Sequence, residues 1–124
     1  MTNLVAVYGT LRKGQGNHRL LAHVKEHRLG TVDGFKMYHL GGFPALQHDV
    51  GTAVVEVYEV DQETMRSLDW LEGYRGKDQT NFYNREITEV NLESGEVVDA
   101  WIYFIDDDMQ HRSVIESGDW VKDR

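Results

Sequence analysis

The stretch VAVYGTLRKGQGNH, at residues 5–18, is the most informative part of the chain. Its first residues belong to a short apolar run, Leu4–Val7, of the kind that forms a buried strand. Gly9 ends that strand, because a residue without Cβ permits a tight turn and the close approach of another group. Thr10 and the peptide N–H groups that follow can then form a nest of donors for an anionic or carbonyl oxygen. An ordinary strand followed by an ordinary turn is the alternative that the local pattern leaves open.

Read with its neighbours, the same loop resembles the signature loop of the gamma-glutamylcyclotransferase-like (AIG2-like) family. The resemblance rests on Tyr8-Gly9-Thr10-Leu11, on Arg12-Lys13-Gly14 and on Asn17-His18. It points to a small bacterial or phage-type member, or to one similar to the gamma-glutamylamine cyclotransferases. Further segments match in order and extend the likeness over nearly the whole chain: Gly42-Phe43-Pro44-Ala45, Val55–Asp61, Leu68-Asp69-Trp70-Leu71-Glu72-Gly73-Tyr74, Tyr83-Asn84-Arg85 and Ser117-Gly118-Asp119-Trp120.

Composition limits the class of protein. A chain of 124 residues predicts a single domain, 1–124. There is no cysteine, which excludes thiol catalysis, thiolate metal sites and disulfides. The formal net charge of −8 argues against a nucleic-acid partner. The sequence has no apolar run of about 20 residues that would span a membrane, and its start, Met1-Thr2-Asn3, lacks the features of a signal peptide. We therefore expect a cytoplasmic protein.

The histidines do not predict a metal site. His23 and His27 are four residues apart, a spacing that would bring both rings to one face of a helix. A zinc site would need further ligands nearby, and His39, His48 and His111 show no such grouping.

The predicted elements are those of an α+β domain. We expect a short helix at residues 18–21 capped by Asn17 and a helix between Asp61 and Gly73. Asp106-Asp107-Asp108 is more typical of a helix cap than of a calcium loop. The strands are predicted at residues 4–7, at 29–40 as two strands around an Asp33-Gly34 turn, and at 52–60, 83–92 and 97–104. The pattern does not separate a small, mostly antiparallel barrel from an open sheet. The family resemblance implies the barrel, with short flanking helices.

The helix that follows residue 60 has clear boundary signals. Asp61 can cap its start and Gly73 can end it. Met65, Leu68 and Leu71 recur at three-residue intervals and predict its buried stripe.

Two polar segments leave alternatives open. Glu56 falls among apolar residues of a strand, so it is either hydrogen-bonded or functional, and we favour a structural role. Residues 74–81 are polar and turn-rich, which fits either a flap over a site or an exposed loop.

The resemblance also implies a reaction, in which the α-amine of a gamma-glutamyl group attacks its own δ-carbonyl. The products are 5-oxoproline and a free amine or amino acid, and no cofactor is needed. Glu72 matches the family's catalytic glutamate as general base and then general acid, and partial burial near Trp70 and Tyr74 would raise its pKa.

For substrate binding the resemblance implies Tyr8, Gly9, Thr10, Leu11 and Tyr83, whereas we expect Arg85 to be structural. The partner is then a small gamma-glutamyl compound, with the leaving group and the oligomeric state left open. The alternative function is a non-catalytic module that binds a small ligand in the same pocket.

Overall fold

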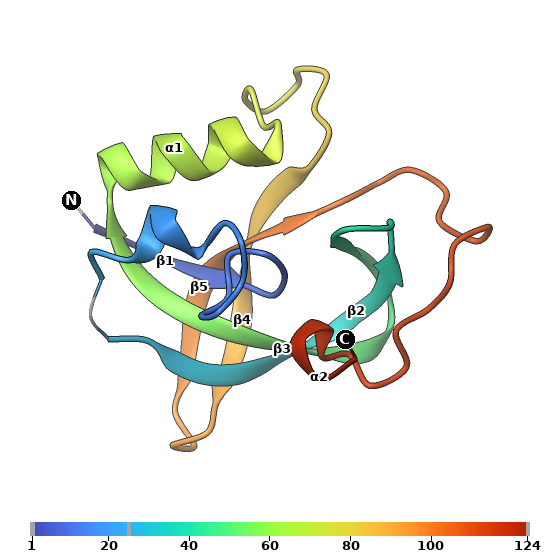
Figure 1. Ribbon diagram of the computed structural model, residues 1–124, viewed down its shortest axis with the longest axis horizontal. Helices are drawn as coiled ribbons and strands as arrows, with labels where there is room; N and C mark the ends of the chain where they lie inside the picture. Colours follow the sequence, from blue (N-terminus) through green and yellow to red (C-terminus); the bar gives the residue numbers. More distant parts are fainter. Residues whose placement is uncertain (1, 25, 124) are drawn as a thin grey trace.

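The computed structural model describes residues 2–24 and 26–123, and within them the strands form a closed barrel in the order β1-β3-β2-β4-β5 (Figure 1). Every neighbouring pair is antiparallel except β1 and β5, which are parallel. The predicted α+β class is confirmed. The elements in chain order are β1 (Thr2–Val7), the 3-10 helix η1 (His18–Leu21), β2 (Arg28–His39), β3 (Pro44–Asp61), α1 (Gln62–Glu72), β4 (Asn84–Leu92), β5 (Val97–Phe104) and α2 (Trp120–Asp123).

The apolar core has two layers, one on each side of β1. Ala6 belongs to the cluster that fills the inside of the barrel, whereas Val5 and Val7 pack outward with Met65 and Leu68 of α1. Helix α1 covers this outer face, with η1 beside it (Figure 1). A strand covered on both faces has no polar side, which explains the continuous apolar run at residues 4–7.

The prediction of two strands around Asp33-Gly34 is wrong. β2 runs through this point and pairs with β3 from Arg28 to His39, with a register shift between Asp33 and Phe35. Gly34 has φ +86°, so it forms a bulge in a continuing strand instead of a hairpin turn. The reversal between β2 and β3 falls later, where the amide of Leu40 donates to the carbonyl of Phe43 over 2.9 Å.

Helix α1 begins and ends as the sequence predicts. The side chain of Asp61 accepts a hydrogen bond from the amide of Thr64 (2.8 Å), and Gly73 ends the helix in the left-handed region at φ +71°. Met65 and Leu68 are buried, but Leu71 is 38% exposed. The buried stripe therefore ends one turn before the end of the helix, and the last turn of α1 lines the cavity described below.

Some predicted local features are absent or differ among the described residues. Asn17 makes no side-chain cap on η1; its side-chain amide donates to the hydroxyl of Thr10 over 2.9 Å instead. The short helix ends at Leu21, so His23 and His27 lie beyond it and do not share a helix face. Among the described residues no helix begins at the aspartates at 106–108, where Asp108 accepts from the amide of Gln110 in a turn.

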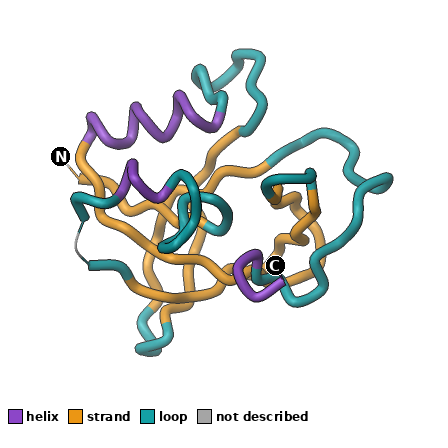
Figure 2. Tube along the Cα trace, viewed as in Figure 1, coloured by secondary structure: helices purple, strands orange, loops and turns teal. Residues whose placement is uncertain are grey.

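The C-terminal segment returns to the barrel as a long loop (Figure 2). Ile115 and Trp120 are buried in the inner cluster, and Val114 bridges to Tyr38 of β2. Among the described residues, neither α1 nor α2 has the length and hydropathy that a membrane-spanning helix requires.

Candidate active site

A cavity of about 330 Å³ opens where the loop after β1 meets the C-terminal end of α1. Its wall contains every residue that the sequence analysis selected for the site: Tyr8, Gly9, Thr10, Leu11, Glu72 and Tyr83. The remaining lining residues are Ala6, Val7, Asn17, Gly42, Phe43, Pro44, Leu71, Phe82 and Tyr103. The fold thus brings together segments that are more than 60 residues apart in the sequence.

The loop after β1 forms one side of the cavity and is drawn in teal in Figure 2. A Cβ on Gly9 would lie 2.8 Å from the ring carbons of Pro44, so the two segments touch at a distance that only glycine permits. Among the described residues, no protein group accepts a hydrogen bond from the amides of Gly9, Thr10 and Leu11. These amides are available donors on the cavity wall, as expected of a nest.

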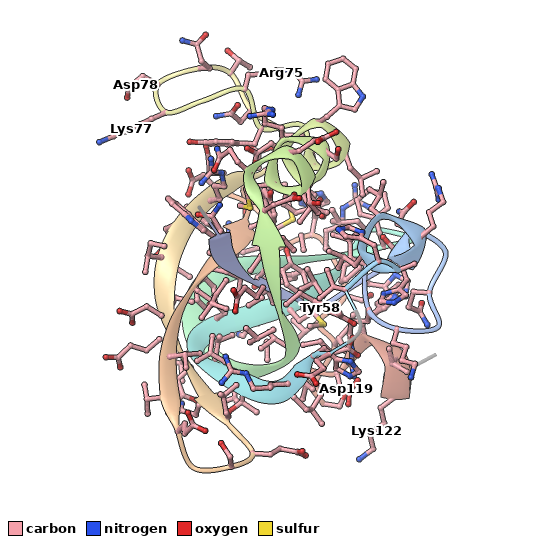
Figure 3. The ribbon with its side chains drawn as sticks, turned by 90° about the vertical axis from the view of Figure 1, so that its left-hand side faces the viewer. Tyr58, Arg75, Lys77, Asp78, Asp119 and Lys122 are labelled. Atoms are coloured by element: carbon pink, nitrogen blue, oxygen red, sulfur yellow. The ribbon has the colours of Figure 1, made fainter. Side chains whose placement is uncertain are left out.

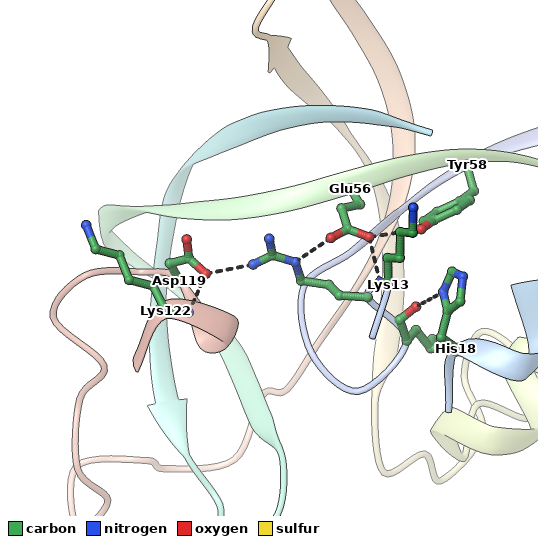
Figure 4. Close-up of polar contacts among 8 residues, drawn as sticks. Lys13, His18, Glu56, Tyr58, Asp119 and Lys122 are labelled. Atoms are coloured by element: carbon green, nitrogen blue, oxygen red, sulfur yellow. Dashed lines mark hydrogen bonds and ion pairs between the residues drawn. The ribbon is translucent and has the colours of Figure 1, made fainter. Parts of the chain in front are cut away.

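A buried network of ion pairs and hydrogen bonds holds this loop in place from outside the cavity (Figure 4). The guanidinium of Arg12 donates to Glu56 of β3 (2.8 Å) and to Asp119 of the C-terminal segment (2.7 Å). Glu56 also accepts from the amide of Lys13 and from the hydroxyl of Tyr58, both over 2.9 Å. The prediction that Glu56 is hydrogen-bonded is therefore confirmed.

The carboxyl of Glu72 faces the cavity from the last residue of α1. Among the described residues, none donates a hydrogen bond to it or forms an ion pair with it. Burial raises the pKa of Glu72 to about 7, and the negative charge of Asp69 contributes to the same rise. Trp70 is 74% exposed, and neither it nor Tyr74 lines the cavity. The two aromatic residues that the sequence analysis placed near Glu72 thus lie outside the cavity wall.

Asp69 lies one helical turn before Glu72 and has partners that sequence reasoning missed. It accepts a hydrogen bond from the hydroxyl of Tyr103 (2.7 Å) and forms an ion pair with Arg85 (2.9 Å). The guanidinium of Arg85 also lies over the rings of Tyr74 and Trp101, at 4.7 and 4.2 Å from their centroids. Arg85 thus holds Asp69 in place and does not line the cavity.

Two tyrosines of the cavity wall have hydroxyls committed to backbone carbonyls. Tyr8 donates to Tyr103 over 2.8 Å, and Tyr83 donates to Pro44 over 2.7 Å. Burial raises the pKa of both phenols above the ordinary value. They therefore stay protonated and shape the cavity as neutral groups.

The loop at residues 74–81 does not line the cavity. Figure 3 shows Arg75, Lys77 and Asp78 projecting from this loop, away from the barrel. The exposed-loop alternative fits this arrangement better than a flap.

Groups that could hold a metal are not clustered. Among residues 2–24 and 26–123, no three His, Asp or Glu side chains lie close enough to bind one ion. The chemistry available at the cavity is that of one carboxyl group and a row of backbone amides.

These features define a class of protein, in which a small closed sheet carries one cavity that is lined by a glycine-containing loop and by a single carboxyl group. The chain belongs to the gamma-glutamyl cyclotransferase, AIG2-like family, whose model matches residues 5–122.

Proteins similar to this chain occur in organisms that are distantly related to one another. A Vibrio cholerae protein with gamma-glutamylcyclotransferase in its name is 37% identical over 125 residues, covering 98% of both chains. The gamma-L-glutamyl-butirosin B gamma-glutamyl cyclotransferase of Niallia circulans is 36% identical over 105 residues, covering 83% of this chain and 66% of that protein. The crystal structure of an AIG2-like protein from Mus musculus matches with a TM-score of 0.69 and 29% identity, covering 83% of this chain and 76% of the other.

Proposed function

We propose that this chain is a gamma-glutamyl cyclotransferase that converts a gamma-glutamyl amine or amino-acid conjugate into 5-oxoproline and a free amine. The observation that carries the proposal is the position of Glu72, which is half-buried and without a protein partner among the described residues. It shares a cavity with the available amides of Gly9, Thr10 and Leu11. The family membership and the name of the Niallia circulans relative support the same class of reaction.

The first task of the site is to fold the substrate for ring closure. Amides of the loop after β1 would bind oxygens of the gamma-glutamyl group, and the walls would bend the chain so that its α-nitrogen faces its δ-carbon. Holding both reacting atoms in one bound molecule can supply about 7–11 kcal/mol of the barrier. An amide aligned with the developing oxyanion would add about 2.7–4 kcal/mol.

The second task is proton transfer, which falls to Glu72. The α-ammonium group of a peptide has a pKa of about 8, so a carboxylate with a pKa of about 7 can accept a proton from such a group with little energetic cost. The resulting amine attacks the δ-carbonyl, and the tetrahedral intermediate collapses as protonated Glu72 donates to the leaving nitrogen. One carboxyl thus acts as base and then as acid.

Protons and charges balance without a further reactant. The α-ammonium loses two protons when it becomes the ring N–H, and the released amine gains both as it leaves as an ammonium ion. One C–N bond forms and one breaks, and no water is consumed.

The experiment is to incubate the protein with a panel of gamma-glutamyl amines and gamma-glutamyl amino acids and to measure 5-oxoproline. Calorimetry with 5-oxoproline, the product, reports binding on the same sample. Turnover of at least one panel member supports the proposal. Binding of 5-oxoproline with no product from any member would contradict it and favour the non-catalytic binding module.

A further inference from the structure

The entrance of the cavity carries a group of apolar side chains that the proposed reaction does not use. Phe43, Leu71 and Phe82 all line the cavity, and they are 38%, 38% and 51% exposed. Large apolar side chains that gather at an opening and remain exposed mark a surface that contacts a ligand.

Phe82 is fixed next to the catalytic carboxyl. Its amide donates to the carbonyl of Gly73 over 3.0 Å, and the amide of Tyr83 donates to the carbonyl of Glu72 over 3.2 Å. A Cβ on Gly73 would lie 2.9 Å from the Cβ of Phe82, so the two segments are in close contact. Leu71 precedes Glu72 in the chain, and the side chains of Leu71 and Phe82 line the same cavity as the carboxyl that would protonate the leaving nitrogen.

Phe43 reaches the same entrance from the β2–β3 reversal. Its ring centroid lies 6.2 Å from that of Phe82, with 59° between the ring planes. That distance is in the range in which aromatic rings interact. Two aromatic side chains from different segments thus form an apolar edge around one opening.

The cavity wall offers no cation to a charged leaving group. Among the described residues that line it there is no lysine, arginine or histidine. Arg12 directly follows the amides at residues 9–11, but its guanidinium is buried and bound to Glu56 and Asp119. A leaving group with its own carboxylate, as in a gamma-glutamyl amino acid, would lose hydration here without gaining an ion pair.

We propose that the leaving nitrogen carries an uncharged apolar substituent, aromatic or branched, which packs against Phe43, Leu71 and Phe82. The inference rests on the proposed function. In that function the leaving nitrogen faces Glu72, and the substituent on that nitrogen then lies over these side chains. Of the possible substrates, the structure thus selects gamma-glutamyl amides of apolar amines over gamma-glutamyl amino acids.

The test compares kcat/KM for 5-oxoproline release from three substrates: the gamma-glutamyl amides of benzylamine, methylamine and glycine. We expect the benzylamide to exceed the methylamide by at least about ten-fold, since even one methylene in an apolar pocket is worth 10-fold or more. The glycine conjugate should be the poorest of the three.

Single substitutions test which side chains produce the preference for an apolar substituent on the leaving nitrogen. Phe43→Ala and Phe82→Ala should each lower the ratio of benzylamide to methylamide kcat/KM by about ten-fold. Trp70→Ala is the matched control, because Trp70 is an exposed aromatic residue of α1 outside the cavity wall. This variant should leave the ratio unchanged.

Equal kcat/KM for the benzylamide and the methylamide, or a preference for the glycine conjugate, would overturn this inference while the cyclotransferase function stands. Failure of all three substrates and of the wider panel to yield 5-oxoproline would overturn the proposed function and the inference together.

Discussion

The Nε of Arg12 lies 2.8 Å from Oε2 of Glu56, across a separation of 44 residues in the sequence. The side chains of both are almost fully buried, with exposures of 8% and 6%. A second nitrogen of the same guanidinium binds Asp119, 107 residues further along the chain. This contact joins the loop after β1 to the barrel and to the C-terminal segment, so it holds the amides of the cavity in place from outside the cavity.

Arg12→Met should destabilise the protein strongly. The substitution leaves Glu56 buried without its cation, and breaking a buried pair from one side costs about 3–5 kcal/mol. Urea unfolding followed by circular dichroism measures the free energy of unfolding. Arg19→Met is the control, since Arg19 is exposed and its removal should change that energy by no more than about 0.5 kcal/mol. Equal effects of the two substitutions would show that the network does not stabilise the fold.

Stability should also depend on pH through Glu56. Burial alone would raise its pKa, but hydrogen bonds from Arg12, Lys13 and Tyr58 outweigh burial, and the pKa lies below its ordinary value. Its contribution is therefore complete above the unfolded-state pKa of about 4.3 and is lost as the pH falls through the folded-state pKa.

The measurement is urea unfolding of wild type and Glu56→Gln between pH 7 and pH 3. The difference in free energy of unfolding should be largest at pH 7 and should shrink toward pH 3. Glu59→Gln, at an exposed position of the same strand, should show no such trend. A difference independent of pH would contradict the assignment.

Gly9→Ala should damage the site through the backbone. The new Cβ would meet the ring of Pro44 at 2.8 Å, so the loop or the proline must move. Overpacking of this kind costs about 1–3 kcal/mol, and the displaced amides should lower the rate of 5-oxoproline formation. Gly16→Ala is the matched control in the same loop, because nothing lies within 4 Å of a Cβ at that position. Full activity of Gly9→Ala would show that the position of the loop amides does not depend on the close contact between Gly9 and Pro44.

Asp69→Asn should shift the pH dependence of catalysis. In the proposed mechanism the base form of Glu72 starts the reaction, so kcat/KM should rise with pH through about 7 in the wild type. Removing the negative charge of Asp69 lowers the pKa of Glu72 and should move this rise to lower pH, by about one unit or less. Glu63→Gln, on the exposed first turn of α1, should leave the profile in place. An unchanged profile for Asp69→Asn would mean that its charge does not act on Glu72.

Local signals predicted the parts of the fold that depend on neighbouring residues. The Asp61 cap and Gly73 follow from backbone hydrogen bonding within a few positions. The sequence misplaced the turn at Asp33-Gly34, because a positive-φ glycine serves a bulge as well as a turn. Pairing with the full length of β3, a non-local property, decides between the two.

The lining of the cavity was predictable to a similar depth. The loop after β1 and Glu72 were selected from the family resemblance, whose motifs each lie within a few residues. The contacts of Asp69 with Tyr103 and Arg85 join residues that are 34 and 16 positions apart, so no spacing in the sequence could indicate them. Leu71 continues the three-residue spacing of the buried stripe, and that spacing predicts burial. It borders the cavity instead, because the last turn of α1 extends beyond the part of the barrel that the helix covers.

The role of Glu72 is tested most directly by the rate of 5-oxoproline release from Glu72→Gln, measured beside wild type and Glu59→Gln on the best substrate of the panel. Near-ultraviolet circular dichroism of each sample reports whether the fold is retained. We expect a folded variant whose turnover falls by about 10²–10⁴-fold, the usual contribution of a general acid–base group, while Glu59→Gln keeps the wild-type rate. A folded Glu72→Gln protein that releases 5-oxoproline at the wild-type rate would contradict the account.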